Sequence, residues 1–211
     1  MSRRVVVVSG GLRQPSSTRL LADRMTEAVE RSLRETGEDV TIDVVELREH
    51  AQDLTSMLLT GFATKGLQDV LDRVATADGL IAVTPIFSGS YSGLFKNFFD
   101  VLEEGALEGM PVLMGATAGT ARHSLALEHA VRPLFSYLHA LTVPTAVFGA
   151  TEDFGQAGGS TTADVVPLGA RIDRGARELA ALVASGPPRG DRGPVDPFAL
   201  TVDFETLLGG A

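Results

Sequence analysis

The chain has 211 residues, 44% of them hydrophobic, and a formal net charge of −9. This length and composition fit a single α/β domain with a buried core, and the acidic balance argues against a nucleic-acid partner. The sequence has no cysteine, which excludes disulfides, iron–sulfur clusters and a cysteine nucleophile. Its four histidines lack the spacing of a local zinc motif, so we expect no metal site.

The N-terminal sequence MSRRVVVVSGG has an apolar run that is too short for a signal peptide. No segment approaches the ~20 apolar residues that a membrane span needs. We therefore expect a cytoplasmic protein without a membrane partner.

Strand-like and helical segments alternate along the chain. A continuous β-branched run predicts a buried strand at 5–8, and further apolar segments predict strands at 40–45, 79–84, 111–115 and 145–148. Apolar residues at helical spacing predict helices at 20–36, 67–75, 94–104, 122–140 and 168–184, with a kink or break near Pro133. Residues 46–66 predict a loop with a short helical piece, and the Gly-rich residues 152–164 predict a mobile loop.

Five strands that alternate with helices predict an α/β fold, a doubly wound five-stranded parallel sheet with helices on both faces. The sequence contains no internal repeat and no second core, so residues 1–186 are expected to form one domain. The Pro- and Gly-rich stretch after Gly186 predicts that residues 187–211 form a linker and a C-terminal tail.

In an open parallel sheet, ligands bind beyond the carboxyl ends of the strands, near the point where the strand order reverses. The loops after the first, third and fourth predicted strands are therefore the candidate binding loops.

The first loop favours an anion. It matches neither the P-loop pattern nor the dinucleotide pattern GxGxxG, but it combines hydroxyl groups with one guanidinium ahead of a helix. These residues are Ser9, Arg13, Ser16, Ser17 and Thr18. The first N–H groups of a helix are unpaired and carry a partial positive charge, which stabilises a phosphate. The alternative is that Ser17 or Thr18 only caps the helix.

The second loop, residues 84–93, favours a flat ligand. Pro85 stiffens the exit from the strand, and Gly89 lets the backbone approach a ligand closely. Phe87 and Tyr91 supply aromatic surface. The alternative is an ordinary turn with incidental aromatic residues.

The third loop, residues 115–123, consists mostly of small residues that leave room for a ligand or form a tight turn. We interpret Arg122 and His123, which end it, as the exposed first turn of a helix. Contact with the phosphate or ribose of a nicotinamide is the alternative for these two side chains.

Together these segments resemble the NADPH-dependent FMN reductase family, whose members have a flavodoxin-like fold. The first loop resembles the family's phosphate signature, and TPIFSGSYSGLFKNFFD resembles its flavin-ring signature. The resemblance covers residues 4–185. GTARHSLALEHAVRPLFSYL is similar to the third-loop region of reductases that are partnered with luciferase-like flavin monooxygenases.

The resemblance implies an NAD(P)H:FMN oxidoreductase that uses FMN and NAD(P)H and supplies reduced FMN to a partner monooxygenase. It implies that the five first-loop residues hold the FMN phosphate. It places seven residues around the isoalloxazine, namely Pro85, Ile86, Phe87, Ser88, Gly89, Ser90 and Tyr91. Thr117, Ala118 and Gly119 would line the opposite edge. No residue is assigned as a catalytic acid or base, since hydride transfer needs orientation and a dry pocket above all.

Other functions are compatible with these residues. A quinone or azo reductase with tightly held FMN would share these loops. A non-enzymatic flavodoxin-like carrier is disfavoured, because the chain has no Trp and only two Tyr to sandwich a flavin. A receiver-type signalling domain is rejected, because Ser9 and Thr84 stand where it needs acidic residues.

The helix predicted at 94–104 carries a wide apolar face, formed by Leu94, Phe95, Phe98, Phe99 and Leu102. One apolar stripe suffices to pack a helix on a sheet, so this surplus predicts a homodimer or a tetramer. The alternative is a helix buried deeply within the monomer.

Overall fold

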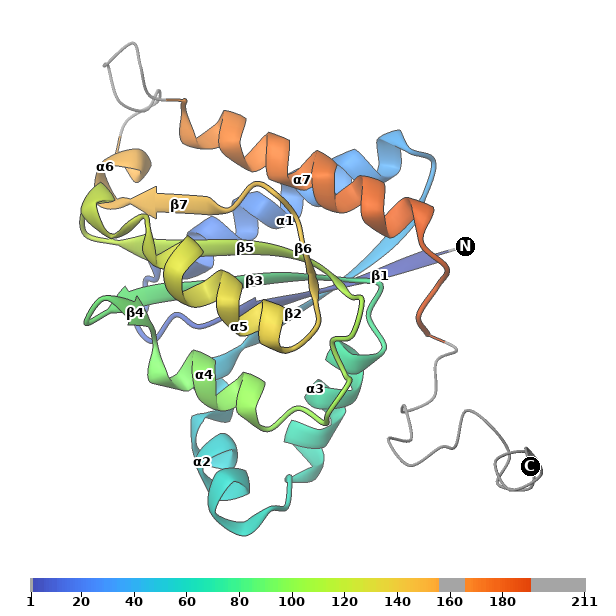
Figure 1. Ribbon diagram of the computed structural model, residues 1–211, viewed down its shortest axis with the longest axis vertical. Coiled ribbons are helices and arrows are strands. Elements are labelled where there is room, and N and C mark those ends of the chain that lie inside the picture. Colours follow the sequence, from blue (N-terminus) through green and yellow to red (C-terminus); the bar gives the residue numbers. More distant parts are fainter. Residues whose placement is uncertain (1, 156–165, 191–211) are drawn as a thin grey trace, which may run out of the picture.

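The computed structural model describes residues 2–155 and 166–190, which form one sheet with helices on both faces (Figure 1). The strands are β1 (Ser2–Ser9), β2 (Asp39–Glu46), β3 (Gly79–Phe87), β4 (Ser90–Tyr91), β5 (Pro111–Ala118), β6 (Leu141–Thr142) and β7 (Val147–Ala150). The order is β2-β1-β3-β5-β6, with β7 also on β5 and β4 on β3. All pairings are parallel except β3–β4. The predicted fold class is therefore confirmed.

Two strands are additional to the five that the sequence predicts. β4 is the return arm of a short hairpin on β3. β6 and β7 pair with successive parts of β5 and together fill the one edge position that the sequence assigns to its fifth strand. Pro144 lies between them and has no N–H to donate, so the edge strand is interrupted there.

The helices cover both faces of the sheet (Figure 1). They are α1 (Ser17–Glu35), α2 (Ala51–Thr60), α3 (Lys65–Ala75), α4 (Gly93–Asp100), α5 (Arg132–Tyr137), α6 (Thr151–Phe154) and α7 (Leu168–Ser185), with the short 3-10 helices η1 (Leu47–His50) and η2 (Ala121–His123) and the π-helix η3 (Leu127–Val131). Successive side chains of β1 point to opposite faces of the sheet, so they pack in two separate core clusters. Val5 and Val7 pack in the cluster under α1 and α7, whereas Val6 and Val8 pack in the cluster with α3, α4 and α5.

Three predicted helical regions differ from the structure. Residues 46–66 are mainly helical, because η1 and α2 fill most of them. α4 ends at Asp100 rather than at residue 104, and Gly105, which has φ of 78°, lies in the turns that follow. The long helix predicted at 122–140 is divided into η2, η3 and α5, and Pro133 lies in the first turn of α5, so the predicted break is confirmed.

The aromatic face of α4 is used inside the monomer. Phe95, Phe98 and Phe99 are at most 2% exposed. The rings of Phe95 and Phe99 lie 4.7 Å apart, and the ring of Phe99 lies 5.0 Å from that of Phe135 on α5. The inference of a subunit interface from this face was therefore wrong in its premise, because α5 and the sheet cover the aromatic side chains.

The chain remains attached to the domain beyond α7. The Arg189 N–H donates to Asp78 Oδ1 (2.7 Å), and its guanidinium donates to the carbonyl oxygens of Glu108 and Ala106. Asp78 Oδ2 accepts from the Arg4 N–H (2.8 Å). The predicted tail from residue 191 and most of the predicted mobile loop lie outside the described residues. Within residues 2–155 and 166–190, none of the helices combines the length and apolar character that a membrane crossing requires.

Candidate functional site

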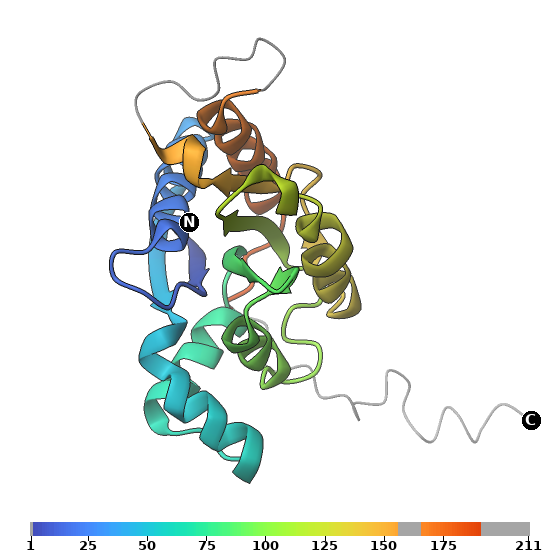
Figure 2. The same ribbon diagram turned by 90° about the vertical axis from the view of Figure 1, so that its left-hand side faces the viewer.

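The three candidate loops meet at the carboxyl edge of the sheet, which faces the viewer in Figure 2. The strand registers place them together, since Ser9 lies beside Val83 and Pro85 lies beside Thr117. The first loop is fastened to β3, because the Gly10 N–H donates to the Val83 carbonyl (2.8 Å). β1 and β3 flank the point where the strand order reverses, so the loops lie where ligands bind in this class of fold.

The start of α1 offers an anion site. Ser16 is the N-cap, and its Oγ accepts from the Arg19 N–H (3.2 Å). Ser17 is exposed, and the N–H groups of Ser17 and Thr18 have no partner among the described residues. Arg13, in the loop that leads into α1, is exposed and makes no ion pair with a described residue. Two free N–H groups therefore lie at the positive end of α1, and the loop before it carries a free guanidinium.

The Thr18 side chain serves the scaffold. It is buried, and its Oγ1 lies 2.8 Å from Oγ1 of the buried Thr117 on β5. This hydrogen bond ties the first loop to the third. Thr18 and Thr117 were predicted as ligand contacts, and the structure does bring them together, with both hydroxyls engaged.

The first loop is compact. An added Cβ at Gly11 would lie 2.2 Å from the Ser16 Oγ, so a side chain there would displace the hydroxyl that caps α1. The Gln14–Pro15 peptide bond is cis. The loop therefore holds its backbone close to the cap of α1, where the free N–H groups lie.

The second loop is a tight hairpin. Ser88 and Gly89 have φ of 49° and 84°, which is typical of a two-residue type I′ turn between β3 and β4. Phe87 at its base is 48% exposed. Gly89 has no atom within 4 Å of a potential Cβ, so the tip stands in open space.

The other predicted ring contacts are partly or wholly packed. Pro85 and Ile86 are buried in β3, and Tyr91 is half-buried with its ring 6.1 Å from that of Phe95. Only the backbone of Pro85 and Ile86 can therefore face a ligand at this edge, whereas Phe87 can offer its side chain.

Two residues to which the sequence analysis assigned no role in the site fix this hairpin. Thr84 is fully buried, and its Oγ1 accepts from the Ser92 N–H (3.1 Å). Ser92 in turn caps α4, since its Oγ accepts from the Phe95 N–H (3.3 Å). A Ser three residues before a buried aromatic was the available signal for this cap.

The third loop is open. Ala118 ends β5, and Gly119 is exposed with nothing within 4 Å of a potential Cβ. Arg122 and His123 lie in η2 and are both exposed. The small residues of this loop therefore leave accessible space beside Phe87 and the hairpin, as a flat ligand requires.

A further network lies at the end of β2. Glu46 accepts hydrogen bonds from Arg19 at one oxygen and from Arg48 at the other (2.8 Å). The hydrogen bond that Arg19 donates to Asp23 raises the pKa of Arg19 above its ordinary value, although partial burial opposes this. Glu46 lies opposite Ser9 in the sheet register, and this strand-end position was the signal that could have identified it.

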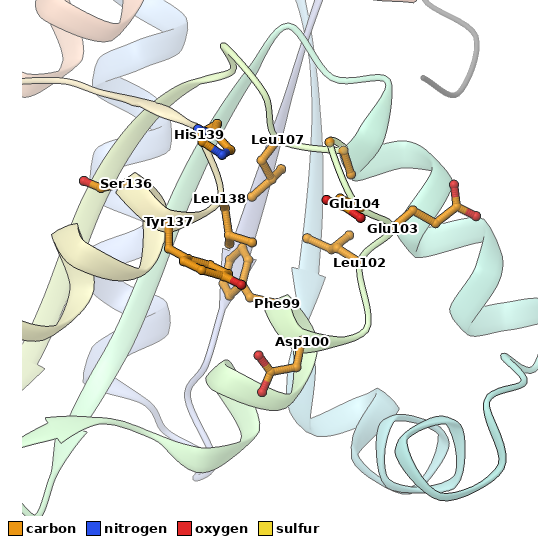
Figure 3. A pocket seen from close by; sticks show the side chains of 12 residues that line it. Phe99, Asp100, Leu102, Glu103, Glu104, Leu107, Ser136, Tyr137, Leu138 and His139 are labelled. Carbon is orange, nitrogen blue, oxygen red and sulfur yellow. The ribbon is translucent and has the colours of Figure 1, made fainter. Parts of the chain in front are cut away.

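Two cavities lie at the amino edge of the sheet. One of about 720 Å³ is lined by the residues that follow α4 and by the end of α5 (Figure 3). Its rim includes Asp100, Glu103 and Glu104, which would repel a phosphate. A second cavity of about 360 Å³ lies beside Ser2, Arg4 and Pro188. In the described part of the chain, no group of three or more His, Asp or Glu side chains is placed to hold a metal ion.

Comparison with known proteins identifies relatives over most of the chain. Residues 3–155 match the model of the family described as NADPH-dependent FMN reductase. The chain is 42% identical to an FMN reductase (NADPH) of Pseudomonas aeruginosa over 72% of this chain and 78% of the relative. It is 36% identical to an NADH-dependent FMN reductase, SfnF, of Pseudomonas fluorescens over 86% and 94% of the two chains. A solved oxidoreductase from Corynebacterium diphtheriae is 45% identical, with a TM-score of 0.81 over 88% of this chain and 99% of that one.

Proposed function

The chain belongs to the NADPH-dependent FMN reductase family and is an NAD(P)H:FMN oxidoreductase, and we propose that it binds FMN across the three loops of the carboxyl edge. The observation that carries this placement is the set of free donors at the start of α1, beside the exposed Arg13. A phosphate there receives N–H groups, a positive helix end and a charge-assisted hydrogen bond.

The remaining loops fit the flavin ring. The backbone of Pro85 and Ile86 with the hairpin tip would flank one side, and Ala118 and Gly119 would line the other. Phe87 offers its half-exposed ring as an apolar contact. The hydrogen bonds of Thr84 and Thr18 hold these loops in place before a ligand arrives.

When bound, FMN supplies a ring that accepts a hydride from NAD(P)H and a proton from solvent, giving reduced FMN and NAD(P)⁺. The chain's own groups bind and orient. The start of α1 fixes the phosphate, and the open Gly119 loop leaves one ring face accessible to a nicotinamide. The described residues of the site include no acid–base pair. This agrees with hydride transfer, whose rate depends mainly on how the two rings are positioned.

Steady-state oxidation of NADH and NADPH, with and without added FMN, tests the activity. We expect FMN-dependent oxidation, followed at the flavin absorbance under anaerobic conditions. An Arg13→Ala variant with unchanged FMN affinity would contradict the proposed phosphate site.

We further propose that reduced FMN is released to a flavin-dependent monooxygenase. The support is the open site, in which no described side chain covers Gly119. Gel filtration of the FMN-loaded protein tests this: FMN that exchanges freely supports release, whereas FMN that stays bound favours the quinone or azo reductase alternative.

A homodimer or tetramer also remains a proposal, now carried by different residues. Leu59 and Phe62, at the end of α2 and just beyond it, are 82% and 80% exposed, and Leu58 is 46% exposed. Exposed apolar groups of this kind are typical of an association surface. Light scattering at micromolar concentration should give a multiple of 22.2 kDa, and a Phe62→Glu variant should give the monomer mass.

Two further proposals concern the location of the enzyme in the cell and the boundary of its functional domain. We propose a cytoplasmic enzyme, which cell fractionation would test. We also propose that residues 1–186 carry the activity, so that removal of residues 191–211 should leave FMN reduction unchanged.

A further inference from the structure

The arginines near the carboxyl edge differ in whether a carboxylate neutralises them. Those with carboxylate partners are Arg19 with Asp23 and Glu46, Arg48 with Glu46, Arg132 with Glu128, and Arg171 with Asp153. Arg13 and Arg122 make no ion pair or hydrogen bond within residues 2–155 and 166–190. His123, next to Arg122, also has no partner in this part of the chain.

The two cationic regions lie on different loops. Arg13 belongs to the first loop, beside the free N–H groups of α1, and is assigned to the FMN phosphate. Arg122 and His123 lie in η2, which follows β5 after two residues and contacts β7. The FMN phosphate therefore leaves Arg122 and His123 available for a second anion.

Two carboxylates in this part of the molecule are already bound by other groups. Glu128 is bound by Arg132, and Asp153 is bound by Arg171 and by the Ala150 N–H. In a chain of net charge −9, a multiply charged ligand needs a local cation, and a free exposed arginine is well suited to a phosphate.

We propose that Arg122, with His123 beside it, binds the phosphate on the adenosine ribose of NADPH, so that this enzyme prefers NADPH to NADH. The inference rests on the proposed function, because the dinucleotide must lie against the flavin at this edge. The ribose phosphate is the only chemical difference between the two nicotinamides, so a cation that binds it discriminates directly.

Kinetics of an Arg122→Ala variant at saturating FMN give the first test. The KM for NADPH should rise about tenfold, as expected for the loss of one charge-assisted hydrogen bond. The KM for NADH and both kcat values should stay within about twofold, and Arg122→Lys should recover part of the discrimination. Arg177→Ala, on the exposed side of α7, is the control that removes the same charge elsewhere.

Binding gives a second readout that does not depend on turnover. By calorimetry, the wild type should bind adenosine 2′,5′-bisphosphate more tightly than AMP, and Arg122→Ala should bind the two about equally. Equal binding by the wild type, or equal loss of NADPH and NADH in the variant, would overturn the proposal. A wild type that oxidises both nicotinamides equally with FMN would refute this inference alone, whereas one that oxidises neither would refute the proposed function.

Discussion

The two edges of the sheet are built on opposite principles. The amino edge has the cavities, an acidic rim, and a buried Arg189 bound by Asp78 and by two carbonyl groups. The carboxyl edge has a compact loop, a hairpin and an open loop, and it presents free N–H groups beside the unpaired Arg13. The carboxyl edge offers free N–H groups to a ligand, whereas Asp78 and Arg189 at the amino edge are bound within the protein itself.

This contrast shows that a hollow surface is a poor guide to function here. The cavity in Figure 3 is lined by Glu103 and Glu104, whose carboxylates would repel an anion. The chemistry is better identified by donors and cations without partners. Changes at the two edges should therefore separate stability from binding.

The largest expected effect is at the amino edge. Asp78→Ala removes the acceptor of the Arg4 and Arg189 N–H groups and leaves buried donors unpaired. We expect a loss of about 2–4 kcal/mol in the free energy of unfolding, measured by urea denaturation. FMN affinity at a temperature where the variant is folded should be unchanged. The exposed Asp72→Ala is the control, with an expected change within about 0.5 kcal/mol.

At the carboxyl edge, Arg13→Ala should act on binding instead. The loss of a charge-assisted hydrogen bond should weaken FMN binding by ~1.5–3 kcal/mol, or roughly ten- to hundredfold, in a fluorescence titration. The melting temperature should stay the same, because Arg13 is exposed and makes no hydrogen bond or ion pair with a described residue. Wild-type affinity for FMN in this variant would contradict the assignment of phosphate binding to the carboxyl edge.

A bulky side chain in the third loop should also affect turnover more than stability. Gly119→Trp places a large ring in open space at the third loop, where no atom lies within 4 Å of a Cβ. We expect roughly a tenfold loss of FMN-dependent turnover with little change in the melting curve. Gly66→Trp, which also enters open space but lies on α3, is the matched control. Gly89 is a less suitable site, because its φ of 84° would strain any side chain.

The smallest expected effect is on the pH dependence of the free energy of unfolding, and it involves no ligand. The hydrogen bond from Arg132 holds the pKa of Glu128 below its ordinary value. A lowered folded pKa stabilises the protein above the unfolded pKa of about 4.3, and this stability is lost as the pH falls through the folded pKa. Since the Glu128 side chain is 46% exposed, Glu128→Gln should cost only about 0.5 kcal/mol at pH 7. The difference from wild type should vanish in acid; a difference that persists there would contradict the assignment.

The parts of the molecule that the sequence predicts well are those with strong local patterns. The buried strand at Val5–Val8 and the Gly-rich hairpin carry their own signals, and the strand order then places the loops together. The burial of Phe99 against Phe135 could not be predicted in this way, because a wide apolar face does not reveal which partner covers it. The hydrogen bond between Thr18 and Thr117 joins residues 99 positions apart, and a pattern along the chain does not contain it.

The attachment of Arg189 has a practical consequence for handling the enzyme. β1 begins at the amino edge, and Arg189 holds the described chain end at that same edge (Figure 1). The first and last described residues therefore both lie on the side of the sheet away from the candidate loops. An enzyme immobilised on a surface or an electrode through the start of β1 should keep its flavin-binding side turned toward the solution.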